Sequence, residues 1–189
     1  MFKRKRKKAF TLVELMVVIA ITAMVATMVF SNMRSGGRSG DVNASAEKLA
    51  GVLKQAQMMA LCGKLINDSR PLGGYGVYLD TSISPNSYIL FANTYEATSY
   101  KYDAGAEKDT IIQTIKLGEQ ISINTVEGYS IIFIPPKSKI YISKGAGING
   151  DPLTGSDFVL ISLKHDDINF YAYVRVNSQG EIDVRKTEE

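Results

Sequence analysis

The first regular pattern in the chain is an apolar run from Phe10 to Phe30, whose hydrophobic residues lie on every face of a helix. These 21 residues include no base and a single acid, Glu14. At about 1.5 Å per residue, a helix of this length measures about 31 Å, which matches a hydrocarbon core about 30 Å thick. The run therefore predicts a helix over residues 10–30 that lies in a membrane or in a dry bundle of helices.

The apolar run ends at Ser31, and a glycine-rich stretch follows it. Gly36, Gly37 and Gly40 fall close together, and each glycine costs about 1 kcal/mol relative to alanine inside a helix. This composition predicts a break in the helix and a flexible hinge over residues 31–43.

A second, amphipathic helix is predicted over residues 44–65, with Asn43 or Ser45 as its N-cap and Gly63 near its end. Its apolar residues recur every three or four positions and form one buried face: Ala46, Leu49, Leu53, Ala56 and Ala60. The polar residues outside that face are Lys48, Lys54, Gln55 and Gln57. Cys62, on or near the same face, is expected to be a buried thiol.

From Gly73 onward the apolar residues fall in short runs between Gly, Pro, Asn, Asp and Ser, which is the pattern of strands joined by turns. The nine predicted strands are Tyr75–Asp80, Tyr88–Ala92, Thr110–Leu117, Ile121–Thr125, Tyr129–Ile134, Lys139–Ser143, Phe158–Lys164, Asn169–Val176 and Ile182–Arg185. No helical pattern separates them, so residues 66–189 are expected to form an antiparallel sheet or sandwich. The predicted fold class is α+β, with the amphipathic helix packed on that β-rich domain.

Charge adds an orientation to this picture. Six consecutive cations, Lys3 to Lys8, stand directly before the apolar run. Positive charge of this kind keeps its side of a spanning helix in the cytoplasm, so the residues after Phe30 are expected to be extracytoplasmic. A secretory signal peptide is the alternative, but its apolar region is about 7–15 residues long, shorter than this run. The run also holds an acid, which an ordinary signal peptide lacks.

Glu14 is the informative residue of the apolar run. A charge at the middle of a membrane helix costs roughly 2.5–3.5 kcal/mol and usually has a partner and a function. Glu14 lies near the cytoplasmic end, where the cost is lower, but it still lies within the run. Its placement requires a reason.

A known signal supplies one. The stretch from Ala9 to Ala20, AFTLVELMVVIA after a basic leader, closely resembles the class III signal of type IV pilins and type II secretion pseudopilins. The resemblance implies that residues 1–9 are a leader cut off by a prepilin peptidase between Ala9 and Phe10, and that the new Phe10 amine is N-methylated. Glu14 is then the fifth mature residue, which acts in assembly in that family. Ala9 departs from the family, which usually has Gly before the cut.

This resemblance implies a structural component of a type IV pilus or a type II secretion pseudopilus. Its partners would be other pilin or pseudopilin subunits, the prepilin peptidase and an inner-membrane assembly platform. The protein would be anchored in the inner membrane with its N-terminus cytoplasmic and its C-terminal domain outside, and would join a filament through its N-terminal helix. A looser resemblance links Phe133, Pro135 and Gly180 to the H-like minor pseudopilins of type II secretion and the minor pilins related to them, which implies a minor component of the filament.

The sequence gives no sign of an enzyme, a cofactor or a metal site. His165 is the only histidine and Cys62 the only cysteine, so a histidine metal cluster and an intramolecular disulfide are both excluded. His165-Asp166-Asp167 is expected to be a polar turn. Residues 95–109 hold four acids, but they lack the Asp/Asn spacing of a calcium loop.

Two other functions stay open. One is a DNA-binding minor pilin for DNA uptake, which would need clustered Arg, Lys and aromatic residues on exposed C-terminal hairpins. Without the six leader cations the chain has 16 bases against 19 acids, and this net charge does not favour a nucleic-acid partner. The other is a membrane-anchored adhesin that never enters a filament.

Overall fold

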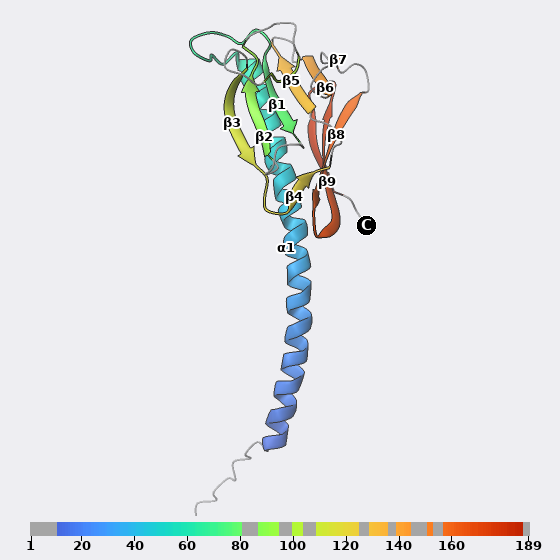
Figure 1. Ribbon diagram of the computed structural model, residues 1–189. Helices are drawn as coiled ribbons and strands as arrows, with labels where there is room; N and C mark the ends of the chain where they lie inside the picture. The colour runs from blue at the N-terminus through green and yellow to red at the C-terminus, as the bar shows by residue number, and fades with distance from the viewer. Residues whose placement is uncertain are drawn as a thin grey trace, which may run out of the picture. The chain divides into compact units, whose positions relative to one another are not determined.

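The computed structural model describes residues 11–80, 87–94, 100–103, 109–124, 129–135, 139–144, 151–152 and 157–186. For residues 31–36, 80, 144 and 151–152 it describes the backbone alone. The chain divides into two compact units, Met1–Arg38 and Ser39–Glu189. Helix α1 (Leu12–Cys62) belongs to both (Figure 1).

The predicted glycine-rich break is wrong, because α1 continues as a helix through residues 31–43. Helix formation is cooperative: once a helix exists, each added residue brings its own hydrogen bond, and a glycine costs only about 1 kcal/mol relative to alanine. A few glycines between two strongly helical stretches therefore do not end the helix. The boundary between the two units, at Arg38 and Ser39, falls within this range. That the segment bends easily stays a prediction.

The end of α1 is a Schellman motif, as the position of Gly63 predicts. Gly63 has φ 58°, and its N–H donates to the Ala60 carbonyl at 3.2 Å, while the Lys64 N–H donates to the Met59 carbonyl at 3.1 Å. The Tyr75 hydroxyl donates to the carbonyl of Lys64. The last turn of the helix is thereby joined to the first strand.

Ten strands follow α1 among the described residues, and all pair antiparallel. They are β1 (Tyr75–Asp80), β2 (Ser87–Ala92), β3 (Thr110–Lys116), β4 (Ile121–Ile123), β5 (Tyr129–Ile134), β6 (Lys139–Lys144), β7 (Asp151–Pro152), β8 (Phe158–His165), β9 (Ile168–Asn177) and β10 (Ile182–Lys186). Each of the nine predicted strands is present, with ends within one residue of the prediction, except that the predicted end at Thr125 lies outside the described residues. The strands form a six-stranded sheet, β3-β2-β1-β5-β6-β7, and a four-stranded sheet, β10-β9-β8-β4. The α+β fold class is confirmed.

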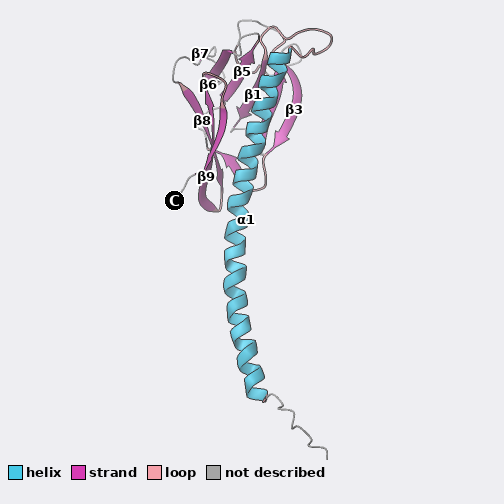
Figure 2. Cartoon of the chain, turned by 180° about the vertical axis from the view of Figure 1, so that it is seen from behind, coloured by secondary structure: helices cyan, strands magenta, loops and turns pink. Residues whose placement is uncertain are grey.

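One hydrophobic core joins the C-terminal part of α1 to both sheets (Figure 2). The five residues predicted to form the buried face of the helix are all completely buried. On β9, Ala172, Val174 and Val176 are buried as their alternation predicts. Gln57, predicted outside the buried face, is half-buried instead, and its Nε2 donates to the Gly180 carbonyl at 3.0 Å.

A smaller apolar cluster covers the other face of the six-stranded sheet. Phe91 is fully buried there, and part of the segment between β2 and β3 packs over it. Tyr102 from this segment stacks on Tyr78, with ring centroids 4.7 Å apart, and meets Phe91 edge-on at 5.0 Å. Tyr100 stacks on Tyr141 at 3.8 Å. Tyr100 and Tyr102 therefore serve packing.

Candidate functional site

The first candidate site is the start of α1, where the sequence places Glu14. Thr11 caps the helix: its Oγ1 accepts a hydrogen bond from the Glu14 N–H at 3.2 Å, and its carbonyl accepts one from Leu15 at 3.2 Å. Thr11 and Glu14 have the spacing of a capping box. Glu14 lies in the first turn of the helix, where the positive end of the helix dipole favours a carboxylate. Ala9 and Phe10 lie outside the described residues.

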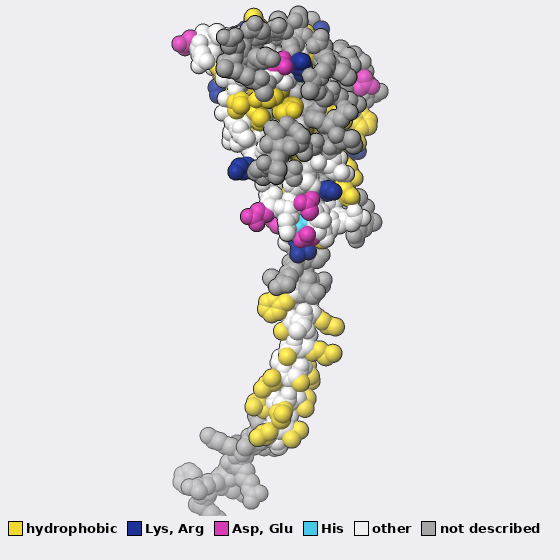
Figure 3. Space-filling model, in the orientation of Figure 1, with side chains coloured by type: hydrophobic (Ala, Val, Ile, Leu, Met, Phe, Trp, Pro, Cys, Tyr) yellow, Lys and Arg dark blue, Asp and Glu magenta, His cyan; other side chains and the backbone are white. Residues whose placement is uncertain are grey.

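The apolar segment that follows has the properties of a membrane helix. Leu12–Phe30 comprises 19 residues and is long and apolar enough to span a membrane. Each of these residues is exposed, and Figure 3 shows the apolar side chains along the segment. The hydroxyls of Thr22 and Thr27 donate to backbone carbonyls of the preceding turn, at 2.9 Å to Val18 and 2.8 Å to Met24. Because these hydroxyls are satisfied within the helix, the segment can face lipid.

The structure shows no cluster that could hold a metal ion among the described residues. No group of three His, Cys, Asp or Glu side chains converges there. His165 ends β8 and is buried, and its Nδ1 accepts a hydrogen bond from the Asp167 N–H at 3.1 Å. Ser162 lies three positions before His165, so the two side chains lie on opposite faces of the strand. The turn prediction holds for Asp166 and Asp167 but is wrong for His165.

Cys62 is exposed, so the prediction of a buried thiol is wrong. The buried face of α1 ends at Ala60, and a residue two positions further along a helix points about 200° away. The acidic segment at 95–109 is described only in part. There the Asp103 N–H donates to Asp109 Oδ2 at 2.8 Å, and Lys101 Nζ lies 3.6 Å from Asp103 Oδ1. These carboxylates bind groups of the protein itself.

An exposed basic and aromatic surface lies on the four-stranded sheet, and we call it the Arg175 face. A cavity of about 540 Å³ marks it, lined by Phe158, Leu160, Tyr173, Arg175, Arg185 and Lys186. Phe158 and Leu160 are 48% and 46% exposed. The guanidinium of Arg175 lies 4.5 Å from the centre of the Phe158 ring, which is a cation–π contact.

The pairing of three strands creates this face. Leu160 of β8 stands opposite Arg175 of β9, and Tyr173 of β9 stands opposite Arg185 of β10. Arg185 also pairs with Asp183, at 3.3 Å. The alternation along β9 places Tyr173 and Arg175 on one face. Only the strand pairing adds the residues of β8 and β10.

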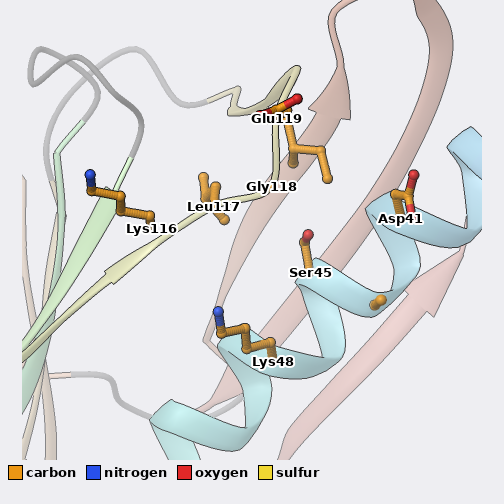
Figure 4. A pocket seen from close by; sticks show the side chains of 9 residues that line it. Asp41, Ser45, Lys48, Lys116, Leu117, Gly118 and Glu119 are labelled. Carbon is orange, nitrogen blue, oxygen red and sulfur yellow. The ribbon is translucent and has the colours of Figure 1, made fainter.

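A second cavity of about 540 Å³ lies between α1 and the β3–β4 connection, and we call it the charged groove (Figure 4). Its lining residues are Asp41, Ala44, Ser45, Lys48, Lys116, Leu117, Gly118, Glu119 and Ile121. Lys48 and Lys116 lie at one end, Asp41 and Glu119 lie at the other, and Ser45 lies between the two ends. This groove could not be predicted from the sequence, because its two walls are about seventy residues apart in the chain.

Comparison with known proteins bears on the first site alone. Residues 4–30 match the family model described as the prokaryotic N-terminal methylation motif. The chain has a pilin-type N-terminal signal. This signal spans five of the six basic residues, the Thr11 cap, Glu14 and the apolar helix. It supports N-terminal processing and a type IV pilin-like or pseudopilin-like protein. No curated protein and no solved structure matches the chain.

Proposed function

We propose that the chain is a minor structural subunit of a type IV pilus or a type II secretion pseudopilus. The observation that carries this proposal is the methylation motif at residues 4–30, followed by an exposed apolar helix whose one charged residue is Glu14. A prepilin peptidase cuts between Ala9 and Phe10 and methylates the new amine. The processed protein remains anchored in the inner membrane, with the residues after Phe30 on the extracytoplasmic side. An assembly platform then adds it to the filament.

The pairing of two charges explains how the helix enters the filament. Cleavage leaves a free amine on Phe10, two residues before α1 begins at Leu12, and the positive end of a helix dipole disfavours a positive charge. In a dry bundle, opposite charges attract far more strongly than in water, and an unpaired charge is heavily penalised. Glu14 of a neighbouring subunit is the counter-charge for the Phe10 amine. A subunit in the wrong register leaves both groups unpaired, so the pair favours one register.

The minor-subunit part of the proposal rests on the C-terminal half. Phe133 lies buried in β5 and Pro135 directly follows that strand. Gly180 has φ 87° in the turn between β9 and β10. These positions support the resemblance to the H-like minor pseudopilins and the minor pilins related to them, in which a strand ending in Phe-x-Pro precedes a final hairpin whose turn carries Gly.

N-terminal processing tests the proposal. Intact-mass and N-terminal peptide analysis of the protein from its own cells should show loss of residues 1–9 and an N-methylated Phe10. Ala9→Leu should block the cut because the site needs a small residue, and Ala9→Gly should be processed normally. Assembled protein that retains Met1 would refute the proposal.

A second candidate function is nucleic-acid binding, and the Arg175 face is the observation that favours it. Single-stranded nucleic acids bind to surfaces that combine cations for the phosphates with aromatic rings for the bases. Phe158 and Tyr173 would supply the rings, and Arg175, Arg185 and Lys186 the cations. The processed chain is acidic overall and should repel nucleic-acid phosphates. Only a locally basic surface such as the Arg175 face could bind them.

This candidate is tested by fluorescence anisotropy with a labelled single-stranded oligonucleotide and the full chain in detergent. Binding through the Arg175 face should weaken steeply as salt rises. Replacing Arg175 and Arg185 together by alanine should weaken it at least tenfold. Lys54→Ala, which removes an exposed cation from α1, is the matched control. Equal loss in the control, or no binding at low salt, would exclude this function.

A further inference from the structure

The charged groove has walls that the fold holds in place. One wall is the exposed side of α1, and the other includes the turn Gly118–Ile121, in which the Ile121 N–H donates to the Gly118 carbonyl at 3.2 Å. The Gln120 carbonyl accepts a hydrogen bond from the Asp166 N–H at 2.8 Å. This second bond ties the turn to the hairpin between β8 and β9. The groove is therefore a built surface between a helix and an anchored turn.

The groove has opposite charges at its two ends. Asp41 and Lys48 lie seven residues apart on α1, which places them on one face and about 10.5 Å apart along the helix axis. Glu119 adds a second acid at the Asp41 end, and Lys116 adds a second base at the Lys48 end. No described residue forms an ion pair with any of the four. A complementary segment must bring an acid to the lysine end.

The same helix supplies such a segment. Each exposed acid of α1 within the second unit is followed seven residues later by an exposed lysine: Asp41 by Lys48, and Glu47 by Lys54. A parallel copy displaced by seven residues, about 10.5 Å along the helix axis, brings its acids to the level of these lysines. Asp41 and Glu47 lie about 120° apart around the helix, so the two pairs serve different neighbours.

We propose that the charged groove receives a second, parallel copy of this chain displaced by one heptad, with Asp41 of that copy between Lys48 and Lys116. The inference rests on the proposed function and narrows it, because it requires at least two copies of this minor subunit to lie side by side and parallel in the filament. Asp41 is short and enters only the lysine end, while Ala44, Ser45 and Gly118 leave room for a neighbouring backbone between the two ends. The pairing of Glu14 with the Phe10 amine favours one register in the apolar part of the helix. The contact of Asp41 with the two lysines favours one register outside the membrane.

Crosslinking in cells between two co-expressed full-length variants tests the register. Both variants carry Cys62→Ser, because Cys62 is exposed and would react. Asp41→Cys should crosslink through a short bismaleimide to Lys48→Cys and to Lys116→Cys of the other copy. The matched control is Lys54→Cys, an exposed position of α1 about 9 Å beyond Lys48 along the helix, which should give little product with Asp41→Cys.

Charge exchange supplies an independent measurement. Lys48→Asp should reduce incorporation into sheared filaments several-fold, and adding Asp41→Lys in the same chain should restore most of it. A merely structural role of Lys48 would not be rescued in this way.

The alternatives give different products. Crosslinks of Asp41→Cys with itself, equal yield with the Lys54→Cys control, or capture of a different subunit would each overturn the second-copy assignment. Incorporation into filaments without these crosslinks would overturn this inference alone. An unprocessed chain that never enters filaments would overturn the proposed function and the inference with it.

Discussion

Two local features surround Glu14 before any partner is present. Thr11 caps the helix through the Glu14 N–H, and the carboxylate lies where the helix dipole favours it. The dipole lowers the cost of an acid at the start of an apolar helix, whereas the Thr11 cap satisfies a backbone N–H whatever side chain residue 14 carries. These features do not show what the charge does after assembly. Substitution of the carboxylate separates its local role at the helix start from its role in pairing with a neighbouring subunit.

We expect Glu14→Gln to be inserted and processed normally but to assemble poorly. The amide costs less than a carboxylate in the apolar segment, so insertion should not suffer. The Phe10 amine of the neighbour loses its counter-charge, which costs roughly 3–5 kcal/mol for a buried pair. The measurement is the ratio of processed variant in sheared filaments to that in the membrane. If the ratio equals that of the wild type, the charge pair has no role in register.

Tyr88 allows a prediction about stability and pH. Its side chain is fully buried and its hydroxyl has no hydrogen-bond partner among the described residues. Burial raises the pKa of Tyr88 to about 12, whereas an unfolded tyrosine ionises near pH 10. The unfolded chain therefore loses this proton first, and stability should fall between about pH 10 and pH 12.

Tyr88→Phe should remove this part of the pH dependence. At neutral pH the variant should be about 1 kcal/mol more stable, because it no longer buries an unsatisfied hydroxyl. Denaturant unfolding at pH 7 and at several values above pH 10 measures both effects. Identical pH slopes in the two proteins would show that Tyr88 ionises normally.

At the scale of one element, α1 shows both the strength and the limit of local patterns. Its buried face is predicted correctly because the spacing of apolar residues determines which side of a helix meets the sheets. The break at residues 31–43 is predicted wrongly because propensity gives the cost of each glycine and not the support from the helix on both sides. Cys62 is misplaced for a similar reason, since the buried face ends before the helix does.

The glycines of α1 carry a prediction of their own. Gly37, Gly40 and Gly51 would each accept a methyl group without any contact within 4 Å. Replacement by alanine should therefore stabilise the helix by about 1 kcal/mol per site without a clash. If residues 31–43 act as a hinge, Gly37→Ala with Gly40→Ala should impair incorporation into filaments.

Gly51→Ala is the matched control, because it stiffens α1 outside the predicted hinge. It should leave incorporation unchanged, and all variants should be processed at Phe10. Sheared filament fractions and membrane fractions, probed side by side, provide the comparison. Normal incorporation of the Gly37 and Gly40 double variant would show that the continuous helix is itself the working form.

At the scale of the molecule, the nine strands are predictable and the two sheets are not. Strand positions follow from local alternation, as on β9, but the order β3-β2-β1-β5-β6-β7 depends on contacts between distant residues. The pilin-type signal is predictable because it lies in one continuous stretch. The Arg175 face and the charged groove combine residues from three strands and from a helix with a distant turn, so they require the assembled fold.

The second unit should fold without the first. A fragment of residues 39–189 contains the whole core of α1 and both sheets, and the described residues form neither a disulfide nor a metal cluster. We expect a monomer whose far-UV dichroism is mainly β with a smaller helical part. The fragment should stay monomeric without the apolar helix. The proposed contact of Asp41 with the lysines of a second copy is an exposed ion pair, which contributes at most about 1 kcal/mol. Unfolding by a chelator would reveal a metal site in the 95–109 segment.

The continuity of α1 has a mechanical consequence. A load applied to the apolar segment passes along one helix into the core, with no linker to extend first. There it acts on the buried row from Val42 to Ala60, whose members hold the helix against two sheets. Because the strands run along this part of the helix (Figures 1 and 2), the load shears many contacts together instead of peeling them one by one. Resistance to tension therefore depends on the packing between the helix and the sheets, and the Schellman motif with its Tyr75 bond secures the far end of that contact.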